Sequence, residues 1–473
     1  MNGPETLTLV QAAEAVARGE VSSLELTEAC IRAIEARHSA LNCFLTFDPD
    51  GALEQARAAD TQRARGESLG PLHGVPLAHK DMFYRAGMRV TCGSKIRAEF
   101  RPRTTATVLE RLAGAGALNL GGLHMAEFAT GPTGHNAHYG PCRNPWNTDY
   151  ITGGSSSGAG AATAASLVFG ALGSDTGGSI RLPAAACGVF GMKGTQTRVS
   201  RHGVMGLSFS LDNVGPLART ARDCARLFGV IAGHDPADAT SSVHPLADYE
   251  AAVLEADVRG LRIGVPQEYF YDNVSEEIRA ILDDSLAVLT SLGARTVPVS
   301  LPMAEAIGGF GLAVSGCEAL ALHRKWLQER PQDYGPQVRA RYESNLGIPA
   351  ADYLAMIQAR PRVIASFVES VFGQCDVLHC PMIGAALPTI EESDVGDRPG
   401  FEELIGRMTR CTRPFNYLAL PALSVPAGFT GNGLPAAFQL VGRPFAEAQL
   451  LRAAAAYEQA TDWPSLNSLQ ERS

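Results

Sequence analysis

The sequence predicts an α/β fold: a mixed, mostly parallel β-sheet covered by helices on both faces. From residue 74 onward, short apolar segments typical of buried strands alternate with helical segments. Strand-like segments return near the C-terminus, at residues 376–380, 422–427 and 434–441, the last two as a hairpin around an Asn-Gly pair. The composition, 45% hydrophobic and 19% charged over 473 residues, is that of an ordinary globular chain. Strands that alternate with helices indicate helices packed on a sheet.

Residues 8–65 are predicted to be helical. Thr8 with Gln11, and Ser22 with Glu25, have the spacing of capping boxes, which satisfy free N–H groups at a helix start. We expect this segment to pack against the rest of the chain and to carry no chemistry.

The next elements follow the α/β pattern. Residues 75–78 are predicted to form a strand that ends at Lys80, residues 106–113 a helix, and residues 117–121 a second strand. Residues 124–147 are rich in Gly, Asn and Pro, which predicts a long loop.

Two glycine pairs, at residues 153–154 and 177–178, are each followed directly by a serine, Ser155 and Ser179. Glycine is needed where the backbone takes positive φ or where another group approaches the main chain closely. Ordinary packing does not require so much Gly and Ser in one stretch, so this pattern indicates a functional site.

The segments around these turns are predicted as a helix over residues 158–167 and a buried strand over 168–172 that leads to the second turn. A further helix over 180–187 stops at Gly188, a common C-terminal residue of helices. Ser179 then lies at a helix N-terminus, where free N–H groups favour negative charge.

A serine in this position has the parts of a nucleophile. The amides of Thr176, Gly177 and Gly178 are predicted to form an oxyanion hole beside it.

Two other motifs compete for the same stretch. A phosphate-binding loop requires Lys where the chain has Ala159. The nucleophile elbow G-x-S-x-G is matched by residues 154–158, centred on Ser156, but no strand-like segment precedes it. An α/β-hydrolase-type esterase with Ser156 as nucleophile is kept as an alternative.

Residues 74–220 resemble the amidase signature family of serine hydrolases in the strings GVPLAHKD, GGSSSG, GSDTGGSIRLPAAACGVFGMK and DNVGPLART. The resemblance implies one large domain spanning residues 1–473. It also implies a catalytic triad in which Ser179 is the nucleophile, Ser155 a bridging serine after a cis peptide bond, and Lys80 the base.

A lysine acts as a base only when it is neutral, so Lys80 must be buried enough to lower its pKa from about 10.4 towards neutrality. The apolar residues 75–78 before it agree with burial. Lys193 is a rival base, for which we favour a structural role. Asp175 and Arg181 are expected to orient the second turn through hydrogen bonds or an ion pair.

The resemblance further implies that Ala129 and Gly131 contact the substrate and that residues 301–375, a mainly helical segment, cap the pocket. The chain departs from the family's usual pattern at residues 121–124, 193–194 and 78–79. These departures leave the triad intact but prevent the transfer of substrate specificity.

The remaining elements complete the α/β pattern. Strands are predicted at residues 262–265 and 296–299, with an amphipathic helix over 275–292 between them. A closing helix is predicted over residues 446–460.

Charge and composition exclude several function classes. The formal net charge is −9 and there is no basic run, so no nucleic-acid partner is expected. We see no secretory signal and no stretch of about 18 apolar residues, so no membrane partner is expected either. The ten scattered cysteines agree with reduced thiols in a cytoplasm.

No cofactor and no metal site are expected. The spacing of His124, His135 and His138 comes with no Cys or Glu pattern typical of a zinc site.

These observations predict an amidase that cleaves the C–N bond of a small carboxylic amide, with esters, carbamates and anilides as further substrates. The alternatives are the esterase above, the A subunit of a glutamine-dependent tRNA amidotransferase, which shares this signature and works with partner subunits, and a binding protein that retains the fold. Whether the chain forms a homodimer is left open.

Overall fold

The computed structural model describes residues 3–301, 303–394, 400–461 and Trp463. Its described strands form one eleven-stranded sheet in the order β1-β3-β2-β4-β6-β5-β10-β11-β9-β7-β8. The bounds of these strands are β1 Phe44–Phe47, β2 Pro76–Lys80, β3 Leu118–Leu123, β4 Ala171–Asp175, β5 Phe190–Lys193, β6 Asn213–Ala218, β7 Arg262–Pro266, β8 Arg295–Val299, β9 Val377–Pro381, β10 Ala422–Phe429 and β11 Pro435–Gly442.

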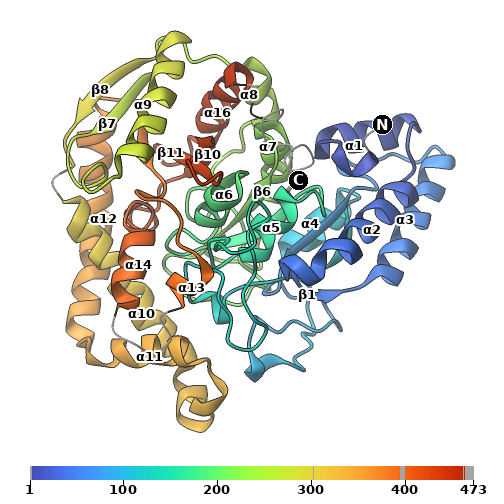
Figure 1. The fold of residues 1–473 in the computed structure, drawn as a ribbon, viewed down its shortest axis with the longest axis horizontal. Coiled ribbons are helices and arrows are strands. Elements are labelled where there is room, and N and C mark those ends of the chain that lie inside the picture. The colour runs from blue at the N-terminus through green and yellow to red at the C-terminus, as the bar shows by residue number, and fades with distance from the viewer. Residues whose placement is uncertain (1–2, 302, 395–399, 462, 464–473) are drawn as a thin grey trace.

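Helices flank this sheet. The first three lie together at the β1 end, and α10 to α12 lie at the opposite side of the molecule (Figure 1). The helix bounds are α1 Leu9–Arg18, α2 Ser23–Leu41, α3 Pro49–Ala64, α4 Thr107–Gly114, α5 Ser157–Ala164, α6 Arg181–Cys187, α7 Ala221–Ile231, α8 Tyr249–Glu255, α9 Glu276–Ser291, α10 Ala304–Glu329, α11 Pro336–Ser344, α12 Ala350–Phe372, α13 Ile390–Ser393, α14 Phe401–Thr409, α15 Pro414–Tyr417 and α16 Glu447–Thr461.

The sheet is mixed, as the sequence predicts. Parallel pairs occur towards its two ends, where β2 pairs with β3 and β4, and β7 pairs with β8 and β9. All other neighbouring strands in the described sheet, including β1 and β3, pair in an antiparallel manner. The described sheet therefore contains fewer parallel pairs than the sequence suggested. The strands β5 and β6 introduce antiparallel pairing, and the sequence did not predict this pairing because neither strand has a clear strand pattern.

The predicted elements are mostly confirmed. Both capping boxes form, at Thr8 before α1 and at Ser22 before α2. The predicted hairpin is present as β10 and β11. Two predictions were wrong: residues 8–65 contain β1 between helices, and the strand expected at 168–172 is β4, which begins only at Ala171.

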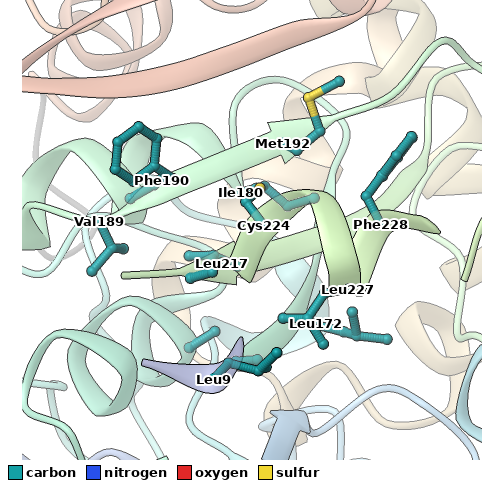
Figure 2. Close-up of a cluster of buried hydrophobic side chains, with 14 of the residues drawn as sticks. Leu9, Leu172, Ile180, Val189, Phe190, Met192, Leu217, Cys224, Leu227 and Phe228 are labelled. Carbon is teal, nitrogen blue, oxygen red and sulfur yellow. The ribbon is translucent and has the colours of Figure 1, made fainter. Parts of the chain in front are cut away.

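The core next to the site is built from β4, β5, β6 and α7. Leu172, Met192, Leu217 and Phe228 come from these four elements in turn, are fully buried and lie close together (Figure 2). Leu9 of α1 lies in the same cluster (Figure 2). This packing fixes β4, which leads directly into the second glycine turn.

Helix α10 is long and apolar enough to cross a membrane by length and composition alone, contrary to the expectation from the sequence. In this fold it packs against α11, α12 and α15. Its Glu318 is buried and accepts hydrogen bonds from Ser210 Oγ at 2.5 Å and from Tyr353 Oη at 2.9 Å. These contacts are those of a helix packed within a globular fold.

The capping box at Ser22 provides a test of local stability. Ser22 Oγ accepts a hydrogen bond from the Glu25 N–H at 3.0 Å, and Glu25 Oε2 accepts one from the Ser22 N–H at 2.8 Å. We expect Ser22→Ala to lower the free energy of unfolding by about 1 kcal/mol, and Ser22→Gly by only a few tenths. Denaturant unfolding monitored by circular dichroism measures both, and equal losses would contradict the capping role.

Candidate active site

Lys80 lies at the carboxyl end of β2, and its side chain is buried, with 1% of the residue exposed. Because β2 and β4 are parallel neighbours, their carboxyl ends lie at the same edge of the sheet. Lys80 Nζ therefore reaches Ser174 of β4, to which it donates a hydrogen bond at 2.9 Å. It donates a second hydrogen bond to Ser155 Oγ at 2.7 Å.

Burial lowers the pKa of Lys80 to about 7, against the opposing charges of Asp212 and Asp175, which raise it. An ammonium group loses hydration when it is buried, so the neutral amine becomes accessible near neutral pH. Lys80 can then accept a proton from a neighbouring hydroxyl.

Ser155 lies in the first glycine turn, and the peptide bond between Gly154 and Ser155 is cis. The carbonyl oxygen of Ser155 accepts a hydrogen bond from the Ala126 N–H at 3.1 Å. A β-carbon on Gly154 would lie 2.6 Å from the carbonyl oxygen of Gly131, so only glycine fits here. The long loop after β3 thus packs directly on the Ser155 turn.

Ser179 lies in the second glycine turn, between β4 and α6. It is partly exposed, whereas Ser155 is fully buried. The two turns meet through the backbone, because the Ser156 N–H donates to the Ser179 carbonyl oxygen at 3.3 Å. The described residues show no hydrogen bond between the hydroxyls of Ser155 and Ser179. Such contacts are often long without substrate and tighten when it binds.

A buried polar network holds the second turn in place. Asp175 pairs with Arg181 at 3.0 Å, as the sequence predicted, and both are fully buried. Burial alone would raise the pKa of Asp175, but the charge and hydrogen bonds of Arg181 hold this pKa below its usual value. Arg181 also donates to Asn416 Oδ1 at 2.8 Å and to Gln439 Oε1 at 2.9 Å. The turn that bears Ser179 is thereby tied to α15 and β11.

A cavity beside the second turn is lined by most of the residues predicted to contact the substrate. Ala129, Gly131, Thr176 and Gly177 line it together with Ser179. Their catalytic and binding roles stay predictions.

The predicted oxyanion donor Gly178 needs correction. Its N–H donates to Asp175 Oδ1 at 2.9 Å, so this amide is engaged within the protein. The amides of Thr176, Gly177 and Ser179 remain as the predicted oxyanion donors on this turn.

The rival nucleophile and the rival base are both engaged in structural contacts. Ser156 is fully buried, and its Oγ accepts from the Ser174 N–H and donates to the Ser174 carbonyl oxygen, each at 3.3 Å. Burial also lowers the pKa of Lys193 to about 7, but Lys193 Nζ donates to the Gly194 carbonyl oxygen at 3.0 Å. Neither serine of the two turns is among its hydrogen-bond partners in the described residues.

Three histidines near the site bond to separate partners. His124, His135 and His138 each have a side-chain contact at 2.8 to 3.0 Å, to Ser157, Ser393 and Glu127 respectively. Within the residues that the structure describes, no group of three or more His, Cys, Asp or Glu is placed to hold a metal ion.

Sequence reasoning missed four residues that the fold brings to the site. Ser174 contacts Lys80, and Asp212 accepts a hydrogen bond from Thr176 Oγ1 at 2.5 Å. Arg341 of α11 and Arg413 line the cavity that contains Ser179. Ser174 could have been found from its place beside Asp175 in the string GSDTGGS, whereas single arginines far along the chain give no signal.

Comparisons with known proteins find relatives over nearly the whole chain. The amidase family model matches residues 25–451. The chain is 43% identical to the A subunit of the glutamyl-tRNA(Gln) amidotransferase of Moorella thermoacetica, over 97% of both chains.

Solved structures also match this chain over nearly its whole length. One is a chain of a vestigial protein complex described as revealing the evolutionary origins of an s-triazine catabolic enzyme. It is 35% identical, with a TM-score of 0.90 over 96% of this chain and 99% of the other. Another is a bacterial aryl acylamidase of the amidase signature family, which is 28% identical, with a TM-score of 0.87 over 98% of both chains.

Proposed function

Because the chain belongs to the amidase signature family, we propose that it hydrolyses the C–N bond of a linear carboxylic amide through an acyl-enzyme on Ser179. The observation that carries this proposal is the buried contact between Lys80 Nζ and Ser155 Oγ at 2.7 Å, next to the turn that bears Ser179. A lysine with a pKa of about 7 supplies the base that a serine nucleophile needs.

The proposed reaction uses the two serines as a relay. Neutral Lys80 takes a proton from Ser155, which takes one from Ser179, and Ser179 Oγ attacks the amide carbon. The amides of Thr176, Gly177 and Ser179 stabilise the oxyanion of the tetrahedral intermediate. The proton returns through Ser155 to the leaving nitrogen, the C–N bond breaks, and the amine departs. Water then attacks the acyl-enzyme, releasing the carboxylate and restoring the Ser179 hydroxyl.

The sequence comparisons favour a narrower second candidate. The 43% identity over 97% of both chains supports a role as the A subunit of an amidotransferase, in which the amide cleaved is that of glutamine and partner subunits are required. The structural likeness to an aryl acylamidase supports a free-standing amidase that also accepts anilides. Both candidates use the same chemistry at Ser179.

The ten cysteines are free thiols. This agrees with the cytoplasmic location that the composition suggests, which we retain as part of the proposal.

A substrate panel tests the proposed function. The purified chain is incubated with aliphatic amides, aryl amides, anilides, carbamates and glutamine, and released amine or ammonia is measured. We expect turnover of at least one amide and labelling of Ser179 by an active-serine probe. Turnover of glutamine only after co-expression with partner subunits would support the amidotransferase candidate. If no substrate in the panel reacts and the probe does not label Ser179, the proposed function is wrong.

A further inference from the structure

Residues 127–131 of the long loop border the cavity beside Ser179, and we call them the wall segment. Ala129 and Gly131 line this cavity together with Ser179. Thr130 lines a second cavity, which has lining residues in common with the first. The conformation of the wall segment therefore sets the shape of the space next to the proposed nucleophile.

Two consecutive residues of the wall segment have a left-handed backbone. Phe128 has a φ of 47° and Ala129 a φ of 60°. This region is unfavourable for residues other than glycine, because the β-carbon comes too close to the following carbonyl oxygen. Such a conformation persists only where the surroundings hold it in place. The contacts of the wall segment therefore decide whether the cavity keeps this border.

Aromatic rings hold the Phe128 side chain. Its ring stacks on Trp326 of α10, with centroids 5.5 Å apart, and meets His323 of the same helix edge-on at 4.5 Å. His323 Nδ1 bonds in turn to Tyr334 Oη at 2.8 Å. Phe128, His323 and Tyr334 are all buried. Stacked and edge-on ring pairs are favourable beyond the area they bury, so this cluster anchors the start of the wall segment.

One hydrogen bond joins the middle of the wall segment to α11. Thr130 Oγ1 and Tyr342 Oη lie 2.8 Å apart, and both residues are buried. Thr130 Oγ1 donates to the Phe128 carbonyl oxygen at 3.3 Å, which leaves it to accept from the Tyr342 hydroxyl. Burial raises the pKa of Tyr342 above its usual value, so this hydroxyl keeps its proton and can donate. The two bonds connect Tyr342 through Thr130 to a left-handed residue.

The wall segment is also tied to the chain just before α11. Glu127 Oε2 accepts from the Gly335 N–H at 2.8 Å, and Glu127 Oε1 accepts from Ser94 Oγ at 2.6 Å. Several donors thus fix the first residue of the segment. Thr130, by contrast, has one side-chain hydrogen bond that leaves the wall segment within the described residues, the bond to Tyr342. This single bond is therefore the point at which the border of the cavity can be tested.

We propose that Tyr342 is a positioning residue, whose hydroxyl holds Thr130 and thereby keeps residues 129–131 in place against a substrate bound at Ser179. This inference rests on the proposed amide hydrolysis at Ser179. Without the hydroxyl, the left-handed backbone at residues 128–129 relaxes and the border of the cavity shifts. Substrate then binds less tightly, while Lys80 and both serines of the relay remain present.

Removing either hydroxyl tests this role. Tyr342→Phe and Thr130→Val each remove the bond with little change in volume. For the best amide of the substrate panel, we expect each to lower kcat/KM by about 3- to 10-fold, the range of one hydrogen bond, mainly through KM. The double variant is expected to match Thr130→Val, because the two changes remove the same bond. Thr130→Ser is expected to recover most of what Thr130→Val loses.

Tyr334→Phe is the matched control. Tyr334 is buried in the same aromatic cluster, but its hydroxyl bonds to His323 instead of to the wall segment. We expect this variant to lower the temperature of thermal unfolding about as much as Tyr342→Phe and to keep kcat/KM within about 2-fold. If both variants lower kcat/KM equally, the loss reflects general loosening of the cluster and the inference is wrong.

Hydrogen exchange separates this inference from the proposed function, because it needs no turnover. Mass spectrometry follows amide exchange in a peptide that covers residues 126–131, in the full-length protein without substrate. We expect faster exchange in Tyr342→Phe and in Thr130→Val than in the wild type or in Tyr334→Phe. Unchanged exchange in the first two variants would overturn the inference even if amides are hydrolysed. Faster exchange without hydrolysis of any amide would support the hold on the wall segment and contradict only the proposed function.

Discussion

Replacing Ser179 with alanine is expected to lower kcat for amide hydrolysis by about 10⁴-fold or more, because no acyl-enzyme can form without the nucleophilic oxygen. Ser179 is partly exposed at the cavity, so the substitution removes one oxygen atom without opening the core. Ammonia release under single-turnover conditions measures the chemical step, and thermal unfolding checks that the variant is folded.

Ser156→Ala is the comparison that separates the two serines proposed as nucleophiles. Ser156 Oγ bonds only to the backbone of Ser174 in the described residues, so its loss is expected to cost stability, about 1 to 3 kcal/mol for the polar groups left unsatisfied. Labelling by an active-serine probe should remain in Ser156→Ala and vanish in Ser179→Ala. The reverse pattern would favour the esterase alternative.

Replacing Lys80 with methionine is expected to lower kcat/KM by about 10²- to 10⁴-fold, the range in which general bases contribute. The proposed base is the neutral amine of Lys80, which is the minor form below the pKa of about 7 and the major form above it. Activity should therefore rise about tenfold per pH unit below pH 7 and level off above it. A pH profile of kcat/KM, which reports groups of the free enzyme, measures this rise.

Lys193→Met is the matched control for the base. Lys193 is equally buried, and burial likewise lowers its pKa to about 7, but its Nζ bonds to the carbonyl oxygen of Gly194 instead of to a serine. We expect this variant to lose stability and to keep the rise in activity around pH 7. If Lys193→Met abolishes the rise while Lys80→Met retains it, the assignment of the base is wrong.

Local patterns in the sequence were sufficient to predict most elements. Capping boxes at Thr8 and Ser22, and the Asn-Gly turn of the C-terminal hairpin, depend on neighbouring residues and were confirmed. β1 was missed because its four residues lie between two long helices and pair only with β3, far along the chain. β6 was missed because it contains Gly215 and Pro216, which are uncommon within strands. Its position is set by pairing with β4 and β5.

In the candidate site, too, residues placed by local sequence could be predicted, and residues placed by distant packing could not. The glycine turns placed Ser155 and Ser179, and the end of a buried strand placed Lys80, because each depends on local chain geometry. Arg341 and Arg413 could not be predicted, since they approach Ser179 only after distant helices pack over the turn. Gly178 was assigned as an oxyanion donor because sequence gives no information on which amide a neighbouring carboxylate occupies.

The network around Arg181 also bears on how the active site assembles during folding. Every proposed catalytic group lies within residues 80–179, yet the turn that carries the nucleophile is held by Asn416 and Gln439, more than 200 residues later. If these partners were absent, Asp175 and Arg181 would remain buried without two of the groups that solvate them. We therefore expect that the signature segment alone does not hold the Ser179 turn in this conformation, and that a nascent chain orders this turn only once Asn416 and Gln439 have joined the fold.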